Sequence, residues 1–137
     1  MTKTVRSSLI VLTLFVALPV VGLAVAKWSI EDGTDRFQSD PIEHEVARRA
    51  YSMAWVHRDN PIQRLLSPAG RVVAVTQAPG HCASKPGPLT DRAIREYTAL
   101  VRFYTFFGYP AGDVYLSCGG SAASSRKPLG WPSLGAG

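Results

Sequence analysis

The sequence predicts an α+β fold in which an N-terminal signal or anchor helix precedes a small exported domain. Three observations support this prediction. Two basic residues at the start, Lys3 and Arg6, are followed by a long apolar run. Two later segments have the spacing of amphipathic helices, and two others have the composition of strands. The chain's two cysteines, Cys82 and Cys118, form an even pair. We therefore expect two amphipathic helices, a short sheet of two strands or slightly more, and one disulfide.

With 137 residues, the chain has the length of a single domain. Its content of 46% hydrophobic and 18% charged residues excludes a coiled-coil fibre and a wholly disordered chain. We expect four regions along it. Residues 1–26 form a targeting or membrane segment, 27–39 a linker, 40–118 the stapled α+β domain, and 119–137 a flexible tail rich in Gly, Ser and Pro.

Two interpretations of residues 1–26 remain open. As a signal peptide, the segment ends on the small residues Ala24-Val25-Ala26, a pattern that signal peptidase accepts. As an uncleaved anchor, residues 9–26 rise about 27 Å as a helix, which is enough to cross a thin bilayer. In both cases the basic start keeps the N-terminus in the cytoplasm and places the rest of the chain outside. We therefore expect an extracytoplasmic protein, either periplasmic or anchored in the inner membrane.

The net charge of +5 first suggests a nucleic-acid partner, but its distribution argues against one. Two of the 15 basic residues lie in the targeting segment, which lowers the net charge of the exported part to +3. Nucleic-acid binding requires a concentrated basic stripe that releases several counterions. Because no run of basic residues is longer than two, we expect no nucleic-acid partner.

Cys82 and Cys118 are expected to form a structural disulfide, because a cysteine pair in a small exported domain is usually oxidised. A metal site or a catalytic thiol is the alternative. The sequence contains no Cys-x-x-Cys and no His-x-x-x-His, so the spacing of common zinc, haem and redox motifs is missing. We expect neither a metal nor another cofactor.

The first amphipathic helix is expected from Pro41 to Arg58. Asp40 suits the N-cap position and Pro41 the first helical position, and Asn60-Pro61 ends the pattern. The apolar stripe of this helix comprises Ile42, Val46, Ala50, Met53 and Ala54. A short helical turn over 61–66 and a β-branched strand over 71–77 follow.

The second amphipathic helix is expected over residues 91–107, with Thr90 as its cap and Gly108 just after its end. A strand over 113–118 then leads to a Gly-Gly pair. Strand, helix and strand in this order predict a right-handed crossover between two parallel strands.

Aromatic residues supply the candidate binding surface. Seven of the 13 aromatics lie between Tyr97 and Tyr115, and Phe103 and Phe106 fall on the polar side of the expected helix. Either a neighbouring element covers these two rings, or they form an exposed patch for a partner or a membrane. With Tyr109 and Trp131, they are the binding residues that the sequence predicts.

One weak catalytic constellation also exists. The expected disulfide would bring His81 near Ser117, Ser121 and the amides of the Gly-Gly pair, which together resemble a Ser–His pair with an anion nest. No third residue that would orient the imidazole can be identified, so this constellation is incomplete.

These observations predict an exported, membrane-associated and non-catalytic accessory or protein-binding subunit on the outer face of a membrane complex. Its partner would be a protein, and residues 9–26 would contact the membrane if they are retained. The alternative is a small secreted or periplasmic hydrolase that uses His81 with Ser117 or Ser121.

Overall fold

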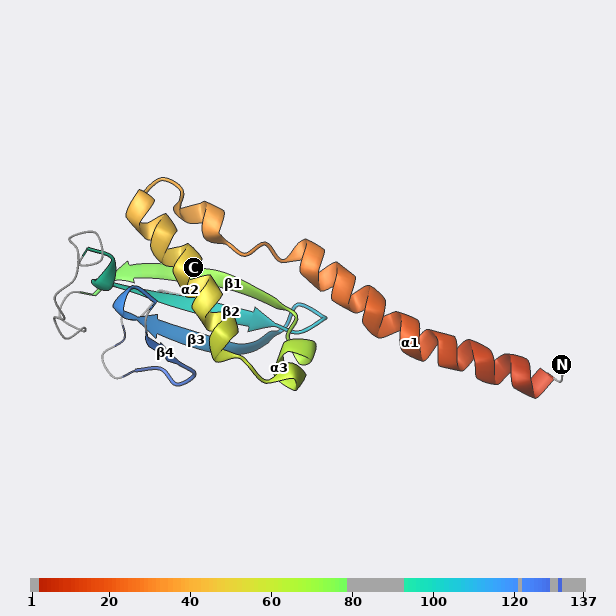
Figure 1. Ribbon diagram of the computed structural model, residues 1–137. Coiled ribbons are helices and arrows are strands. Elements are labelled where there is room, and N and C mark those ends of the chain that lie inside the picture. Colours follow the sequence, from red (N-terminus) through yellow and green to blue (C-terminus); the bar gives the residue numbers. More distant parts are fainter. Residues whose placement is uncertain (1–2, 79–92, 121, 129–130, 132–137) are drawn as a thin grey trace.

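Four antiparallel strands form one sheet, and a helix lies across one of its faces (Figure 1). The computed structural model describes residues 3–78, 93–120, 122–128 and 131. The fold class α+β is therefore confirmed. The elements in chain order are α1 (Lys3–Ser29), η1 (Thr34–Phe37), α2 (Pro41–His57), α3 (Pro61–Leu66), β1 (Ala69–Gln77), β2 (Tyr97–Tyr104), β3 (Pro110–Ser117), η2 (Cys118–Gly120) and β4 (Ala122–Ser124).

Helix α1 extends away from one end of the domain (Figure 1). Most of its described apolar side chains are between 54% and 77% exposed: Ile10, Val11, Leu12, Leu14, Phe15, Val16, Leu18, Val20, Val21 and Val25. Within the described part of the chain, no helix meets the length and apolarity that crossing a membrane requires.

Helix α2 matches its prediction closely. Its N-cap is Asp40, whose Oδ1 accepts hydrogen bonds from the amides of Ile42 at 2.8 Å and Glu43 at 3.4 Å. The predicted apolar stripe is right at its centre and wrong at two positions, because Ile42 and Met53 are 36% and 38% exposed. The buried side of the helix consists of Val46, Ala47, Ala50 and Ala54. These small residues let the helix approach the sheet closely.

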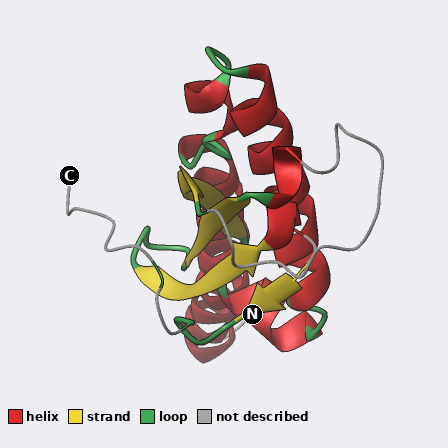
Figure 2. Ribbon diagram, turned by 90° about the vertical axis from the view of Figure 1, so that its left-hand side faces the viewer, coloured by secondary structure: helices red, strands yellow, loops and turns green. Residues whose placement is uncertain are grey.

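The core lies between α2 and the sheet (Figure 2). Side chains of alternate positions on each strand point toward α2, as the pleat requires. Among them, Phe103 is the largest fully buried side chain. Ile94, which precedes β2, also lies in this core. The sheet itself supplies Val72, Ala99, Val101, Phe103, Val114 and Leu116.

The predicted helix over 91–107 is wrong, because residues 97–104 form the strand β2. β2 pairs on both sides, with β1 and with β3, and Thr98 to Val101 are buried without interruption. A strand buried on both faces is nearly continuously apolar, so its pattern also fits a helical period. Thr, Val, Tyr and Phe have a high strand propensity. Pairing with β1 on one edge and β3 on the other then stabilises the strand over the helix.

The predicted parallel crossover is also wrong. β1 and β3 do run in the same direction, but β2 lies between them and is antiparallel to both. The sequence predicts a sheet of two strands or slightly more, and the structure has four strands, because residues predicted as a helix and as the tail form β2 and β4.

Both segments flanking the predicted domain contribute to its packing. The carbonyl of Asp32 accepts a hydrogen bond of 2.7 Å from the amide of Val72 on β1, and Thr34 is buried. Beyond β3, Gly119 has a positive φ of 66°, and a Cβ at this position would lie 2.6 Å from Cγ2 of Ile94. This glycine therefore permits a close approach of two segments rather than flexibility.

Cys118 directly follows β3 as the first residue of η2 and is not a free thiol. Its predicted partner, Cys82, lies outside the described residues. The pairing of the two thus stays a prediction.

Candidate functional site

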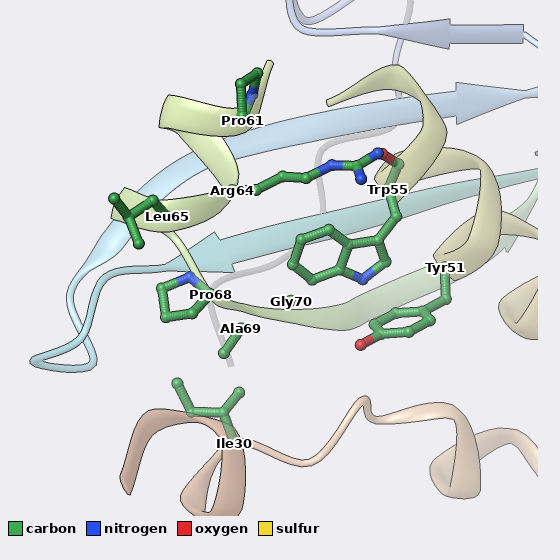
Figure 3. A pocket seen from close by; sticks show the side chains of 9 residues that line it. All are labelled: Ile30, Tyr51, Trp55, Pro61, Arg64, Leu65, Pro68, Ala69 and Gly70. Atoms are coloured by element: carbon green, nitrogen blue, oxygen red, sulfur yellow. The ribbon is translucent and has the colours of Figure 1, made fainter. Parts of the chain in front are cut away.

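A groove of about 590 Å³ lies at the end of the domain where α1 joins it (Figure 3). It runs between the last turns of α2, the helix α3 and the start of β1, and Ile30 faces it from the chain segment after α1. The lining residues are Ile30, Tyr51, Trp55, Pro61, Arg64, Leu65, Pro68, Ala69 and Gly70. A groove lined mainly by apolar and aromatic side chains with one cation is suited to binding an apolar group.

Two aromatic side chains of α2 form one wall of the groove (Figure 3). Tyr51 and Trp55 are one helical turn apart, and their rings meet edge to face with centroids 6.3 Å apart. Below them, the buried ring of Phe103 meets Trp55 edge to face at 4.9 Å. The core therefore fixes the orientation of Trp55, which makes the wall rigid before any ligand binds.

Gly70 allows β1 to pass beneath these rings. A Cβ at this position would lie 3.1 Å from Cε1 of Phe103 and 3.6 Å from Cζ2 of Trp55. The first distance is tighter than an ordinary contact and the second is not, so a larger residue would push against the Phe103 ring that supports Trp55.

Arg64 holds α3 against the C-terminal end of α2. Its Nε donates a hydrogen bond of 2.7 Å to the carbonyl of Arg58, and its Nη2 donates one of 3.0 Å to the carbonyl of Trp55. A cation at this position also complements the negative end of the helix dipole. The opposite wall of the groove is thereby tied to the helix that carries Tyr51 and Trp55.

A second arginine lies against the same core ring. The Cζ atom of Arg58 is 4.3 Å from the centroid of the Phe103 ring, which is a cation–π contact. Burial lowers the pKa of the Arg58 guanidinium, and its buried Nη1 has no hydrogen-bond partner among the described residues. The aromatic ring is thus a principal neighbour of this charge.

The predicted aromatic surface is not assembled as one patch. Phe103 is fully buried and Trp131 is 8% exposed, with its ring 5.1 Å from that of Tyr115. Phe106 is partly buried beside α1, whereas Tyr109 is 70% exposed. Of the four predicted binding residues, Tyr109 is the one with a largely exposed side chain.

The structure does not bring the predicted catalytic residues together within its described part. Ser117 is partly buried at the end of β3, whereas His81 and Ser121 lie outside the described residues. His44 has a structural contact, because its Nδ1 is 3.3 Å from the carbonyl of Thr34. No group of His, Cys, Asp and Glu side chains in the described ranges could hold a metal ion.

The sequence alone does not predict the groove, although it contains part of the signal for it. Tyr51 and Trp55 are four residues apart on a correctly predicted helix, which places two aromatics on one face. The other walls come from α3, β1 and Ile30, and no periodic pattern links these segments.

Comparisons of the chain with protein-family models, with curated proteins and with solved structures found no match.

Proposed function

We propose that this chain is an exported, membrane-associated accessory subunit that acts by binding a protein on the outer face of a membrane complex. The observation that carries the proposal is α1, which includes the basic residues Lys3 and Arg6 in its first turns and then exposes apolar side chains along its length. Exposed apolar surface of this extent is unfavourable in water, and a bilayer or a translocation channel removes it from water. The folded domain after α1 would then lie outside the cytoplasm.

The proposal includes two fates for residues 1–26, cleavage after Ala26 or retention as an anchor. Intact-mass measurement on protein from its native host distinguishes them directly. A mass lacking the first 26 residues would identify a signal peptide, and the full mass in the membrane fraction would identify an anchor. Full-length protein in the soluble cytoplasmic fraction would contradict export.

Protein binding is assigned to the groove. Trp, Tyr and Arg are the residues most enriched among those that dominate binding energy, and Trp55, Tyr51 and Arg64 all line it. Since Phe103 and Arg64 already hold the walls in place, little conformational entropy remains to be lost on binding. We infer that an apolar side chain of a membrane-protein partner enters the groove.

Leu65 provides a test that spares the core, because it lines the groove and is 57% exposed. A photoreactive benzoyl-phenylalanine at position 65 should form a discrete cross-linked product in native membranes. The same group at Val56, which is 62% exposed on α2 outside the groove, is the matched control. In a co-purification assay, Leu65→Glu should remove the partner and Val56→Glu should retain it.

Equal cross-linking at positions 65 and 56 would contradict binding in the groove. Loss of the partner in both glutamate variants would contradict it as well. Circular dichroism of each variant reports whether the fold is intact, so a folding defect is not mistaken for lost binding.

A further inference from the structure

The helix α3 and the β2–β3 turn lie at the end of the domain from which α1 emerges (Figure 1), and both expose apolar side chains. Ile62 and Leu66 on α3 are 64% and 56% exposed, and Phe107 and Tyr109 in and after the β2–β3 turn are 83% and 70% exposed. We call these four residues the apolar collar. Exposed apolar side chains that gather at one end of a small domain typically mark a site that contacts a partner or a membrane.

Helix α1 passes this collar in direct contact with the β2–β3 turn. A Cβ placed on Gly22 would lie 3.6 Å from Cβ of Phe106 and 3.7 Å from its Cδ1. Farther along the chain, Ile30 lines the groove together with Leu65 of α3. The β2–β3 turn is therefore held beside α1 itself, and α3 lies beside the segment that directly follows α1.

The contact at Gly22 sets the level of the β2–β3 turn relative to the proposed anchor. If residues 9–26 span the bilayer, Gly22 lies four residues, or about 6 Å along the helix, inside the outer end of the span. Side chains that bind at the interface enter to a depth of about 5–10 Å. The β2–β3 turn is thus at the depth where the headgroups meet the acyl chains.

The chemistry of the collar suits this depth. Phe107 and Tyr109 are aromatic, and aromatic side chains are favoured at the boundary between lipid and water. Neither residues 61–66 nor residues 105–110 include a carboxylate, so no acidic group would have to be desolvated or placed against anionic lipid.

We propose that the apolar collar inserts into the outer headgroup region of the bilayer in which residues 9–26, if retained, would be anchored, and thereby fixes the orientation of the domain. This inference rests on the proposed membrane tether. The occupant is lipid rather than a partner protein, because α1 brings the collar to the bilayer without any other chain. The groove beside it is then held at a constant height and angle above the membrane.

The test uses the full-length chain in vesicles of phosphatidylcholine and phosphatidylglycerol at a ratio of about three to one. An environment-sensitive fluorophore is attached to Phe107→Cys, or to Val56→Cys as the matched exposed control. We expect bromolipids to quench the label at position 107 at least about threefold more than the label at position 56. Aqueous iodide should show the opposite preference.

The Phe107→Cys label has a second control in which Ile62, Leu66 and Tyr109 are replaced by Ser. Because these side chains are exposed, the domain should remain folded, and bromolipid quenching at position 107 should fall by about half or more. Unchanged quenching would overturn a collar that acts as a unit.

Flotation of the same vesicles separates failure of the collar from failure of the tether. A chain that floats but shows equal iodide quenching at positions 107 and 56 retains the tether and overturns the collar. A chain that does not float contradicts the tether and the collar together. Protection of position 107 in native membranes but not in lipid vesicles would assign the collar to a protein partner and overturn the lipid proposal.

Discussion

Phe103 shows how strongly the role of one residue depends on the element that carries it. On a helix, this ring would have pointed to the polar side and towards a partner. On β2 it points into the core, where it contacts Trp55 at 4.9 Å and the guanidinium of Arg58 at 4.3 Å. The residue therefore supports the groove from below instead of forming a binding surface itself.

We expect Phe103→Ala to lower the free energy of unfolding by about 3–5 kcal/mol, because it leaves a large cavity beneath Trp55. Phe107→Ala should change it by less than about 0.5 kcal/mol, because Phe107 is 83% exposed. Urea denaturation followed by tryptophan fluorescence measures both values. Similar losses in the two variants would contradict the assignment of Phe103 to the core and Phe107 to the surface.

At the level of single elements, local signals determine how well a segment can be predicted. The start of α2 is marked by Asp40, Pro41 and Glu43 within four residues, and the structure begins the helix at Pro41. These signals are local because the first amides of a helix need partners close in sequence.

Replacing the cap of α2 should have a measurable effect. We expect Asp40→Ala to lower the free energy of unfolding by about 1 kcal/mol, because the amides of Ile42 and Glu43 lose their acceptor. Asp40→Asn should be close to neutral, since its side-chain oxygen can still accept these bonds. Chemical denaturation of the three proteins provides the comparison, and equal losses in both variants would argue against capping.

The outer face of α2 gives a pH-dependent prediction. The hydrogen bond from Nε of Arg49 lowers the pKa of Glu45 below its ordinary value of 4.5. A carboxyl whose pKa is lower in the folded state stabilises the fold above its unfolded pKa and loses this effect as the pH falls. Because the pair is near the surface, the contribution is at most about 0.5 kcal/mol.

We therefore expect Glu45→Gln to be less stable than the parent at pH 7 and equal to it at about pH 3. Thermal unfolding at the two pH values measures the difference, with Glu31→Gln as a surface control. A difference that persists at the lower pH would show that the ion pair is not its source.

Long-range pairing limits the prediction of β2 in a way that does not apply to α2. Residues 97–104 read equally well as a helix and as a strand, because their apolar positions are almost continuous. Only the presence of β1 and β3 on both sides determines the outcome. The same dependence explains why the short strand β4 was assigned to a tail.

At the scale of the whole molecule, the sequence predicts the fold class and the apolar N-terminal helix better than it predicts the site. The groove is lined by Ile30 and by residues within 51–55, 61–65 and 68–70. These segments meet because the chain folds back through α3 between α2 and β1. One wall, the Tyr51 and Trp55 pair, can be identified from spacing. Arg64 cannot, because its role depends on carbonyl groups six and nine residues away.

The predicted disulfide is a property of the whole domain, since it would link the end of β3 to the segment before β2. If Cys82 and Cys118 are joined, replacing both by Ser should lower the free energy of unfolding by about 3.5–4 kcal/mol in the chain-entropy model. Intact mass with and without reductant before alkylation measures the bond, and urea denaturation measures the loss. Two thiols that are alkylated without reductant would contradict the pairing.

The order of the strands in the sheet also has a kinetic consequence. Each strand pairs with the strand that precedes it along the chain, and only residues 105–109 separate β2 from β3. Closing so short a loop costs little entropy, whereas joining β1 to β2 requires closure of the longer connection over residues 78–96. The β2–β3 hairpin should therefore form first. If the chain is exported as we propose, it can complete its sheet only after most of the domain has left the translocation channel.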